Sequence, residues 1–233
     1  MKPILIAYAT REGHTRRVAE RVASTLAASG GQSELVDVET LAEPLDLGSY
    51  RAAVLAASVH VGHYEPEMVG FAKWYRSELA TLPTAFIGVS LSEATVEDAT
   101  APPEKREEAA RDVDRALDHF FTATGWQPSQ FKPVAGALTY THYGALQRFI
   151  VKLVAKRSGL STDTSHDWEY TNFAELEQFV RDFESGISAR FEPTSDEASR
   201  LGPRSEARSE GGPPARPNGD TIGVQRVVRR HRW

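Results

Sequence analysis

Two patterns of apolar and polar positions alternate along the first 185 residues. Short, almost wholly apolar runs such as Ile4–Tyr8 are typical of strands that are covered on both faces of a parallel sheet. Between them, apolar residues recur three and four positions apart, which predicts amphipathic helices. The predicted strands are Ile4–Tyr8, Ser33–Val38, Ala52–Ala57, Thr84–Val89 and Val134–Thr139. The predicted helices are His14–Ala28, Glu67–Leu79, Glu107–Ala123, Tyr143–Lys156 and Phe173–Phe183.

This alternation predicts the fold class. Strands separated by helices are joined by right-handed crossovers, which gives a mostly parallel sheet with helices on both faces. We therefore expect one doubly wound α/β domain with a five-stranded sheet over residues 1–185. The stretch Ser92–Lys105 is polar and is predicted to be a loop, while Thr171 or Asn172 is a suitable cap for the last helix.

Composition changes near residue 186. The segment Glu192–Asp220 is rich in Pro, Gly, Ser, Glu and Arg and has almost no large apolar residue, so we expect residues 186–233 to form a disordered tail. This tail holds nine Arg and six acidic residues, a net charge of +3, whereas residues 1–185 carry 18 basic and 26 acidic side chains, a net charge of -8. The basic end Arg226–Trp233 either contacts an acidic surface or anionic lipid, or is solvated without a fixed partner.

Several classes of function are disfavoured. The chain has no cysteine, so it has no disulfide, thiolate metal site or cysteine nucleophile. No apolar run reaches the roughly 18–20 residues that span a bilayer, and the N-terminal residues lack the features of a signal peptide, so a cytoplasmic location is the expectation. A net charge of -5 argues against nucleic-acid binding. The G-x-S-x-G elbow, the NTPase P-loop and the G-x-G-x-x-G fingerprint are all missing.

In an open α/β sheet the ligand binds beyond the carboxyl ends of the strands, so the loops there are the candidate site. The first loop, Thr10–Thr15, joins a strand to a helix. A phosphate at this point would meet free backbone N–H groups, the positive end of the helix dipole and the hydroxyls of Thr10 and Thr15. Gly13 would let the backbone approach the ligand closely. The alternative is a plain strand-to-helix turn capped by Thr10.

The loop Ser58–Pro66 after the third strand offers a glycine, Tyr64 and two imidazoles. An aromatic ring here would stack on a planar ligand. The alternative is that Tyr64 and the histidines only cover the end of the sheet. His60 and His63 lack a cysteine or a matched carboxylate spacing, so no metal site is expected.

Several short segments, in the same order, resemble the flavodoxin-type, menaquinone-dependent protoporphyrinogen oxidases of the flavodoxin superfamily. The resemblance covers about residues 2–184. The segments and their family counterparts are Ala9–Thr15 (S-T-R-D-G-Q-T), Ala57–Tyr64 (A-S-I-R-Y-G-H-Y), Ala135–Tyr140 (A-G-A-L-R-Y), Arg148–Leu153 (R-F-M-I-K-L) and Thr162–Thr164 (T-D-T).

The resemblance implies a flavodoxin-like fold with FMN as the cofactor. It implies that the FMN phosphate is held by Thr10, Arg11, Glu12, Gly13, His14 and Thr15. The loops implied to flank the isoalloxazine ring are Ser58, Val59, His60, Val61, Gly62, His63 and Tyr64, with Ser90, Leu91 and Ser92. His63, Tyr64 and Tyr140 are the candidates for the substrate face. No catalytic acid or base is assigned, because the flavin performs the hydride and electron chemistry.

The implied reaction is removal of hydrogen from protoporphyrinogen IX, with a quinone reoxidising the flavin, as in heme biosynthesis. The basic amphipathic helix Tyr143–Lys156 would then lie against the inner face of the cell membrane, or would simply be a helix with a solvated basic face. Two other functions remain open: a flavodoxin-like electron carrier or quinone reductase, and a non-enzymatic flavodoxin-fold binding module. The oligomeric state is also open, with a homo-oligomer among the alternatives.

Overall fold

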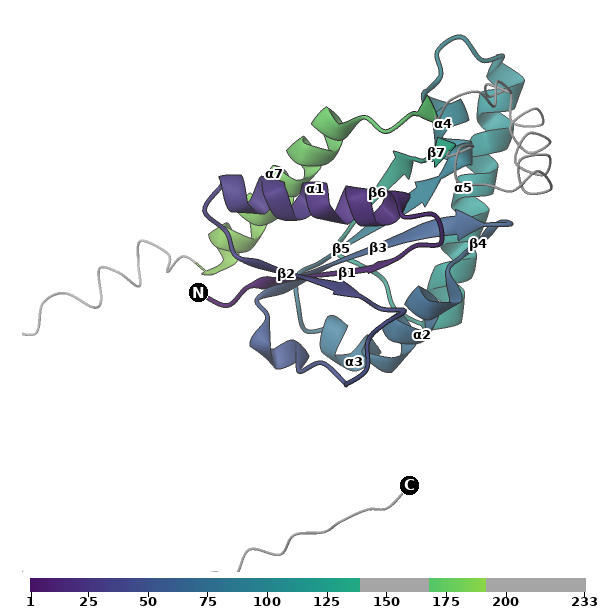
Figure 1. Cartoon of the computed structure of the whole chain (residues 1–233). Helices are drawn as coiled ribbons and strands as arrows, with labels where there is room; N and C mark the ends of the chain where they lie inside the picture. Colours follow the sequence, from purple (N-terminus) through teal and green to yellow (C-terminus); the bar gives the residue numbers. More distant parts are fainter. Residues whose placement is uncertain (139–167, 192–233) are drawn as a thin grey trace, which may run out of the picture. The chain divides into compact units, whose positions relative to one another are not determined.

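The computed structural model describes residues 1–138 and 168–191, and these contain a twisted parallel sheet (Figure 1). Its strand order is β2-β1-β3-β5-β6, and every neighbouring pair in that order is parallel. The short strand β4 pairs antiparallel with the end of β3. The strands are β1 Ile4–Ala9, β2 Ser33–Asp37, β3 Ala52–His60, β4 His63–Tyr64, β5 Thr84–Ser90 and β6 Gln130–Ala135. The predicted five-stranded, doubly wound α/β fold is confirmed.

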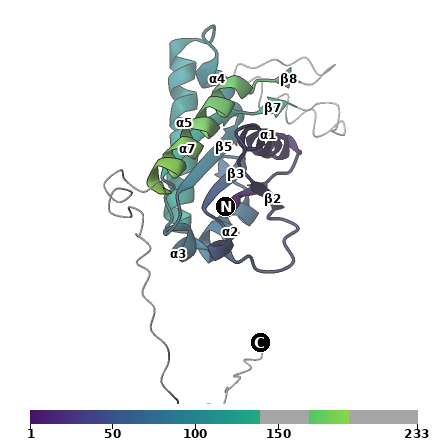
Figure 2. The same ribbon diagram turned by 90° about the vertical axis from the view of Figure 1, so that its left-hand side faces the viewer.

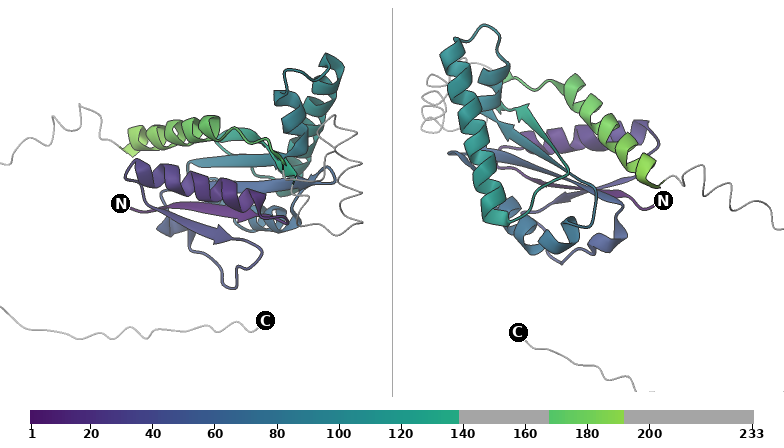
Figure 3. Two further views of the ribbon diagram at one scale, coloured as in Figure 1. Left: turned by 45° about the horizontal axis from the view of Figure 1, so that its top comes forward. Right: turned by 180° about the vertical axis from the view of Figure 1, so that it is seen from behind.

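Helices cover both faces of the sheet. On one face lie α1 (His14–Ala28) and α7 (Phe173–Phe191), and on the other lie α2 (Pro66–Trp74), α3 (Arg76–Leu79) and α5 (Pro103–Thr124), as Figures 2 and 3 show. Strand β1 is buried on both sides because it alternates between two cores. Its residues Ile4, Ile6 and Tyr8 face α1 and α7, whereas Leu5, Ala7 and Ala9 face the other helices.

One helix in the structure was not predicted. The polar stretch after β5 contains α4 (Leu91–Glu97), and α5 begins at Pro103 rather than at Glu107. The expectation of a loop there was wrong because the residues around it cap the helices. The Ser90 hydroxyl accepts a hydrogen bond from the Glu93 N–H at 3.1 Å, and Pro103 occupies the first turn of α5, where a missing N–H costs nothing.

The end of the sheet also differs from the prediction. The fifth strand of the prediction, Val134–Thr139, is displaced: β6 ends at Ala135, and Gly136 separates it from β7 (Ala137–Leu138). Strand β7 pairs antiparallel with β8 (Trp168–Glu169). The start of β6 was missed because its first residues are partly polar. An edge strand that contains a proline, here Pro133, does not need to be apolar throughout.

Helix α7 continues to Phe191, into the region predicted to be tail. It extends because Ile187 is buried and continues the apolar stripe of Val180 and Phe183. Of the two predicted caps, Asn172 caps the helix: its Oδ1 accepts from the Glu175 N–H at 3.3 Å. The predicted helix Tyr143–Lys156 and residues 192–233 lie outside the described residues. Within the described part, no helix is both long enough and apolar enough to cross a bilayer.

Candidate functional site

The three loops expected to form a site are neighbours in space. They follow β1, β3 and β5, which are adjacent and parallel, so all three loops leave the same edge of the sheet. Strand β2 lies on the opposite side of β1 from β3. The chain therefore reverses its strand order between β1 and β3, which is where ligands bind in open α/β sheets.

The first loop ends in an uncapped helix. Gly13 has a φ of 81°, in the left-handed region that favours glycine, and its N–H donates to the Thr10 hydroxyl at 3.0 Å. No described residue lies within 4 Å of the position that a Cβ on Gly13 would occupy. Among the described residues, no side chain caps the N-terminus of α1, and the fully buried Thr15 hydroxyl has no hydrogen-bond partner. These donors are available to a bound group.

His14 is fixed by the segment before α7. Its Nε2 lies 2.9 Å from the Thr171 hydroxyl, which itself donates to the Ala135 carbonyl at 2.6 Å, so the imidazole is the donor to Thr171. Burial lowers the pKa of His14, and the nearby Glu169 carboxylate opposes that effect. Through Thr171 the ring ties the start of α1 to the end of β6.

A buried carboxylate joins the first loop to the end of β3. Glu65 Oε2 lies 2.7 Å from Nε of Arg11, and its Oε1 accepts a hydrogen bond from the Ser58 hydroxyl at 3.1 Å. The Glu65 N–H also donates to the Ser58 carbonyl at 3.2 Å. The Glu65 side chain is only 2% exposed, whereas the Arg11 side chain is 51% exposed. The loops after β1 and β3 are therefore connected through one carboxylate.

The second loop is a tight hairpin between β3 and β4. Val61 and Gly62 have φ values of 50° and 79°, the signs required at the two central positions of a type I′ turn. A β-branched residue rarely adopts this conformation, and Val61 is 85% exposed at the tip. His60 and His63 pair across the hairpin, and Nδ1 of His63 lies 3.4 Å from Nδ1 of His119 on α5. Within the described residues, no group of three His, Asp or Glu side chains is placed to hold a metal ion.

The Tyr64 side chain is buried in the core. Its ring packs edge-on against Phe86 and Phe120 at centroid distances of 5.0 and 5.3 Å, and the residue is only 5% exposed. Burial raises the pKa of its hydroxyl, which lies directly over Gly88. The prediction that Tyr64 stacks on a planar ligand or lines the substrate face is corrected: the ring belongs to the core between the sheet and α5.

The third loop is short because α4 begins at once. Ser90 is buried and caps this helix, while Leu91 and Ser92 form its first turn. Glu93, in the first turn of α4, is 8% exposed. Burial, followed by the negative charge of Glu97, raises the pKa of Glu93 to about 7. A neutral, protonated carboxyl is thus favoured beside the expected flavin loops at mildly acidic pH.

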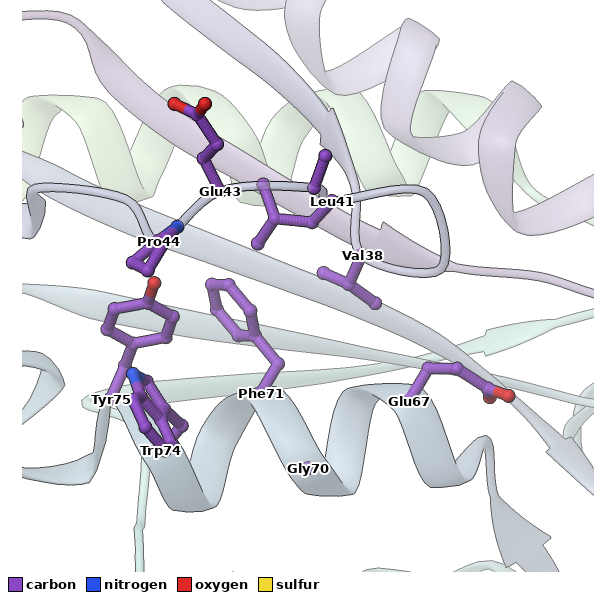
Figure 4. A pocket seen from close by; sticks show the side chains of 10 residues that line it. Val38, Leu41, Glu43, Pro44, Glu67, Gly70, Phe71, Trp74 and Tyr75 are labelled. Atoms are coloured by element: carbon purple, nitrogen blue, oxygen red, sulfur yellow. The ribbon is translucent and has the colours of Figure 1, made fainter. Parts of the chain in front are cut away.

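The described residues form cavities near the chain after β2 and near the first loop. The larger, about 320 Å³, lies between the chain after β2 and helix α2, and its wall includes the rings of Phe71, Trp74 and Tyr75 (Figure 4). The second, about 280 Å³, is lined by Ala9, Thr10, Arg11, Glu39, Glu65 and Glu67. Three carboxylates against one guanidinium disfavour an anion in the second cavity. The α1 side of the loop, where the helix N-terminus has no side-chain cap, is the more favourable side for an anion.

Sequence reasoning missed three residues that the structure brings to these loops. Glu65, Thr171 and His119 contact predicted site residues that are 54, 157 and 56 positions away in the chain. Glu65 is a buried acidic residue directly before a proline that begins a helix, which is its only local signal. Of the predicted residues, Tyr140 lies outside the described residues.

The strand order and the loops at its reversal define the class of flavodoxin-like, doubly wound proteins. A family model described as "Flavodoxin domain" matches residues 5–165, and the chain belongs to this family.

The chain is also similar to proteins whose names state an activity. An Escherichia coli (strain K12) protein named "Protoporphyrinogen IX dehydrogenase [quinone]" is 33% identical over 178 residues, which are 76% of this chain and 92% of the relative. A Leishmania major protein of the same name is 27% identical over 180 residues, 77% of this chain and 73% of the relative. Among solved structures, oxidised Flavodoxin 1 from Bacillus cereus is 16% identical with a TM-score of 0.45, and the match covers 78% of this chain and 97% of that one.

Proposed function

We propose that this protein is an FMN-dependent oxidoreductase that oxidises protoporphyrinogen IX and passes the electrons to a quinone. The observation that carries this proposal is the similarity to a relative that is named for this reaction. The two sequences are 33% identical over 92% of the length of the relative. The expected FMN loops of the chain fall within the matched flavodoxin domain, residues 5–165.

The geometry of the first loop fits the phosphate of FMN. The uncapped N-terminus of α1 offers backbone N–H groups and the positive end of the helix dipole, both of which stabilise an anion. The Thr15 hydroxyl, which has no partner among the described residues, provides a further donor. Those residues also leave space beside Gly13 through which an anion can approach. The Thr10 oxygen accepts from the Gly13 N–H and so holds the loop in shape, and this contact leaves the Thr10 O–H available as a donor.

The hairpin and the start of α4 would hold the isoalloxazine ring. Residues 60–63 form the exposed part of the hairpin, and Ser90–Ser92 are at the end of the neighbouring strand β5. Because the turn is already formed by the pairing of β3 with β4, less ordering is needed when a flat ligand binds. Tyr64 supports this hairpin from below, since its ring is packed in the core.

When bound, FMN supplies the hydride and electron transfer, and the protein orients it and excludes competing reactions. The chain's own residues therefore bind and position the cofactor, and we assign none of them as a catalytic acid or base. His63 is the substrate-face candidate that the structure leaves exposed. Transient contact of Tyr143–Lys156 with a membrane surface, where lipid quinones reside, is part of the proposal and depends on the sequence of that segment alone.

An absorption spectrum of the purified protein after FMN addition tests cofactor binding, and anaerobic mixing with protoporphyrinogen IX tests the substrate. We expect bound flavin that is bleached by the porphyrinogen and recovers its colour when a quinone is added. Protein that takes up no FMN would refute the proposal and favour a non-enzymatic binding module.

A second function is favoured by one observation. Between residues 93 and 118 there are nine acidic and four basic side chains, and this negative charge repels the propionates of a porphyrinogen. An electron carrier or quinone reductase would not face that repulsion. Flavin that binds but is not reduced by protoporphyrinogen IX, while a quinone reoxidises it after chemical reduction, would establish this alternative.

The role of Thr15 has its own test. Thr15→Val keeps the shape of the side chain and removes the donor, so FMN affinity should fall by roughly 0.5–1.5 kcal/mol. Riboflavin, which lacks the phosphate, should bind both proteins equally. Thr25→Val is the matched control, because Thr25 is also buried on α1 and its hydroxyl donates to the Arg21 carbonyl of its own helix. Equal losses for the two ligands would place the phosphate elsewhere.

A further inference from the structure

One buried carboxylate connects the two loops that the proposed function assigns to different parts of FMN. Arg11 lies in the phosphate loop, and Ser58 lies where β3 enters the hairpin that would flank the ring. Glu65 binds both, at 2.7 Å and 3.1 Å. Its two carboxylate oxygens are divided between the two loops, so neither loop can move from the other without breaking a charge-assisted or buried hydrogen bond.

The burial of Glu65 makes this connection rigid. The side chain is 2% exposed, and a buried carboxylate is costly unless it is paired and hydrogen-bonded. The following Pro66 begins α2, and the Glu65 N–H is bonded to the Ser58 carbonyl, so its backbone is fixed as well. Breaking the contact with Arg11 would leave an unpaired charge inside the protein. The paired state is therefore strongly favoured before any ligand binds.

Arg11 is bonded to Glu65 through one nitrogen of its guanidinium. Its Nε bonds to Glu65, while the side chain remains 51% exposed. An arginine carries five N–H donors, so the terminal nitrogens are not consumed by this contact. The cavity beside it is also lined by Glu39 and Glu67. The Glu67 charge helps Glu65 to raise the pKa of Arg11, but among the described residues only Glu65 is bonded to the guanidinium. Glu65 differs from its acidic neighbours in being bonded directly to both loops.

We propose that Glu65 is a positioning residue that fixes the phosphate loop relative to the ring-flanking hairpin, so that FMN meets both halves of its site already in place. This inference rests on the proposed binding of FMN. FMN engages both loops, whereas riboflavin engages the hairpin alone. With Glu65 intact, FMN binds without the entropic cost of ordering one loop against the other. Glu65 therefore increases the contribution of the phosphate to affinity without contacting the cofactor.

The test measures the ratio of the dissociation constant for riboflavin to that for FMN, by flavin fluorescence titration on the full chain. In Glu65→Gln the amide keeps the size of the side chain and loses its charge. We expect the ratio to fall about tenfold, as for loss of one charge-assisted hydrogen bond. Arg11→Gln should lower the ratio too, and the double variant should lose no more than the larger single loss, because both changes break one connection. Ser58→Ala removes the hydrogen bond between Ser58 and Glu65 and should lower the ratio less than Glu65→Gln does.

Glu67→Gln is the matched control, because Glu67 lines the same cavity and makes no such bond. Its ratio should stay at the wild-type value. An unchanged ratio in Glu65→Gln, or an equal fall in Glu67→Gln, would overturn the inference. Additive losses in the double variant would also overturn it, since Arg11 and Glu65 would then act separately. Wild-type protein that binds no FMN at all would instead refute the proposed function, so the two failures are distinguishable. Far-ultraviolet circular dichroism of each variant confirms that it is folded.

Discussion

Glu93 gives the protein a pH-dependent stability that can be measured directly. Its carboxyl is buried in the first turn of α4, and the charged groups that act on it are Glu97, Lys132, Asp114 and Glu175. Burial and the nearby acidic groups outweigh Lys132, so the folded state raises the pKa from its ordinary value to about 7. Replacement by Gln removes the charge and keeps the shape of the side chain.

The sign follows from proton uptake. Between the unfolded pKa of about 4.5 and the folded pKa of about 7, the folded state keeps the proton that the unfolded state releases. The stability of the wild-type protein therefore falls as pH rises through this window. Each pKa unit corresponds to about 1.4 kcal/mol, and partial hydration of the carboxyl reduces the total, so we expect a loss of about 2 kcal/mol. Glu93→Gln lacks this loss.

Urea unfolding followed by circular dichroism at about pH 5 and about pH 8 measures the effect. The variant should be close to wild type at the lower pH and more stable than wild type by about 2 kcal/mol at the higher pH. Glu43→Gln, at an exposed carboxylate, is the control and should show the same difference from wild type at both pH values. A difference between Glu93→Gln and wild type that does not change with pH would refute the reasoning.

Three further predictions concern stability and are measured by urea or thermal unfolding. Phe86→Ala should destabilise by about 3–5 kcal/mol, because this fully buried ring stacks on Phe120 at 4.6 Å; a loss below about 1 kcal/mol would contradict its place in the core. Gly88→Ala should destabilise because its Cβ would collide with the Tyr64 hydroxyl, and Tyr64→Phe in the same chain should recover part of the loss; no recovery would assign the strain elsewhere. Asn172→Ala should cost about 1 kcal/mol by removing the cap of α7, and an unchanged midpoint would show that the cap is dispensable.

Much of the fold could be predicted from the sequence because the core strands are recognisable from their own residues alone. Strand β1 is apolar at every position, and β3 and β5 are apolar over Ala52–Ala57 and Ala85–Val89. Such runs have few stable arrangements other than the middle of a parallel sheet. The helix His14–Ala28 was predicted with both its ends, since its apolar spacing and the glycines after it agree. Prediction failed for α4 and β6, where short polar segments depend on a cap or a neighbouring strand.

For the candidate site, the positions of the loops could be predicted from the sequence, but the contacts of their side chains could not. Positions 10–15, 58–64 and 90–92 lie at or just after the C-terminal ends of neighbouring strands, and strand order alone brings these segments to one edge of the sheet. Which side chains meet there depends on contacts between distant parts of the chain. The pairing of Glu65 with Arg11 requires β1 and β3 to be adjacent, and His14 finds Thr171 only after α7 packs beside α1.

Tyr64 shows most clearly what only the tertiary structure decided. The sequence placed an aromatic residue in the right loop, but it did not reveal the face to which the ring points. The turn at Val61 and Gly62 sets Tyr64 opposite Val59, and this register directs the ring into the core beside Phe86 and Phe120. Because side chains alternate with a period of two, a shift of one residue would have turned the same ring to the opposite face of the hairpin. Local pattern therefore determined the strands and the loops of this protein, while register and packing determined the direction of their side chains.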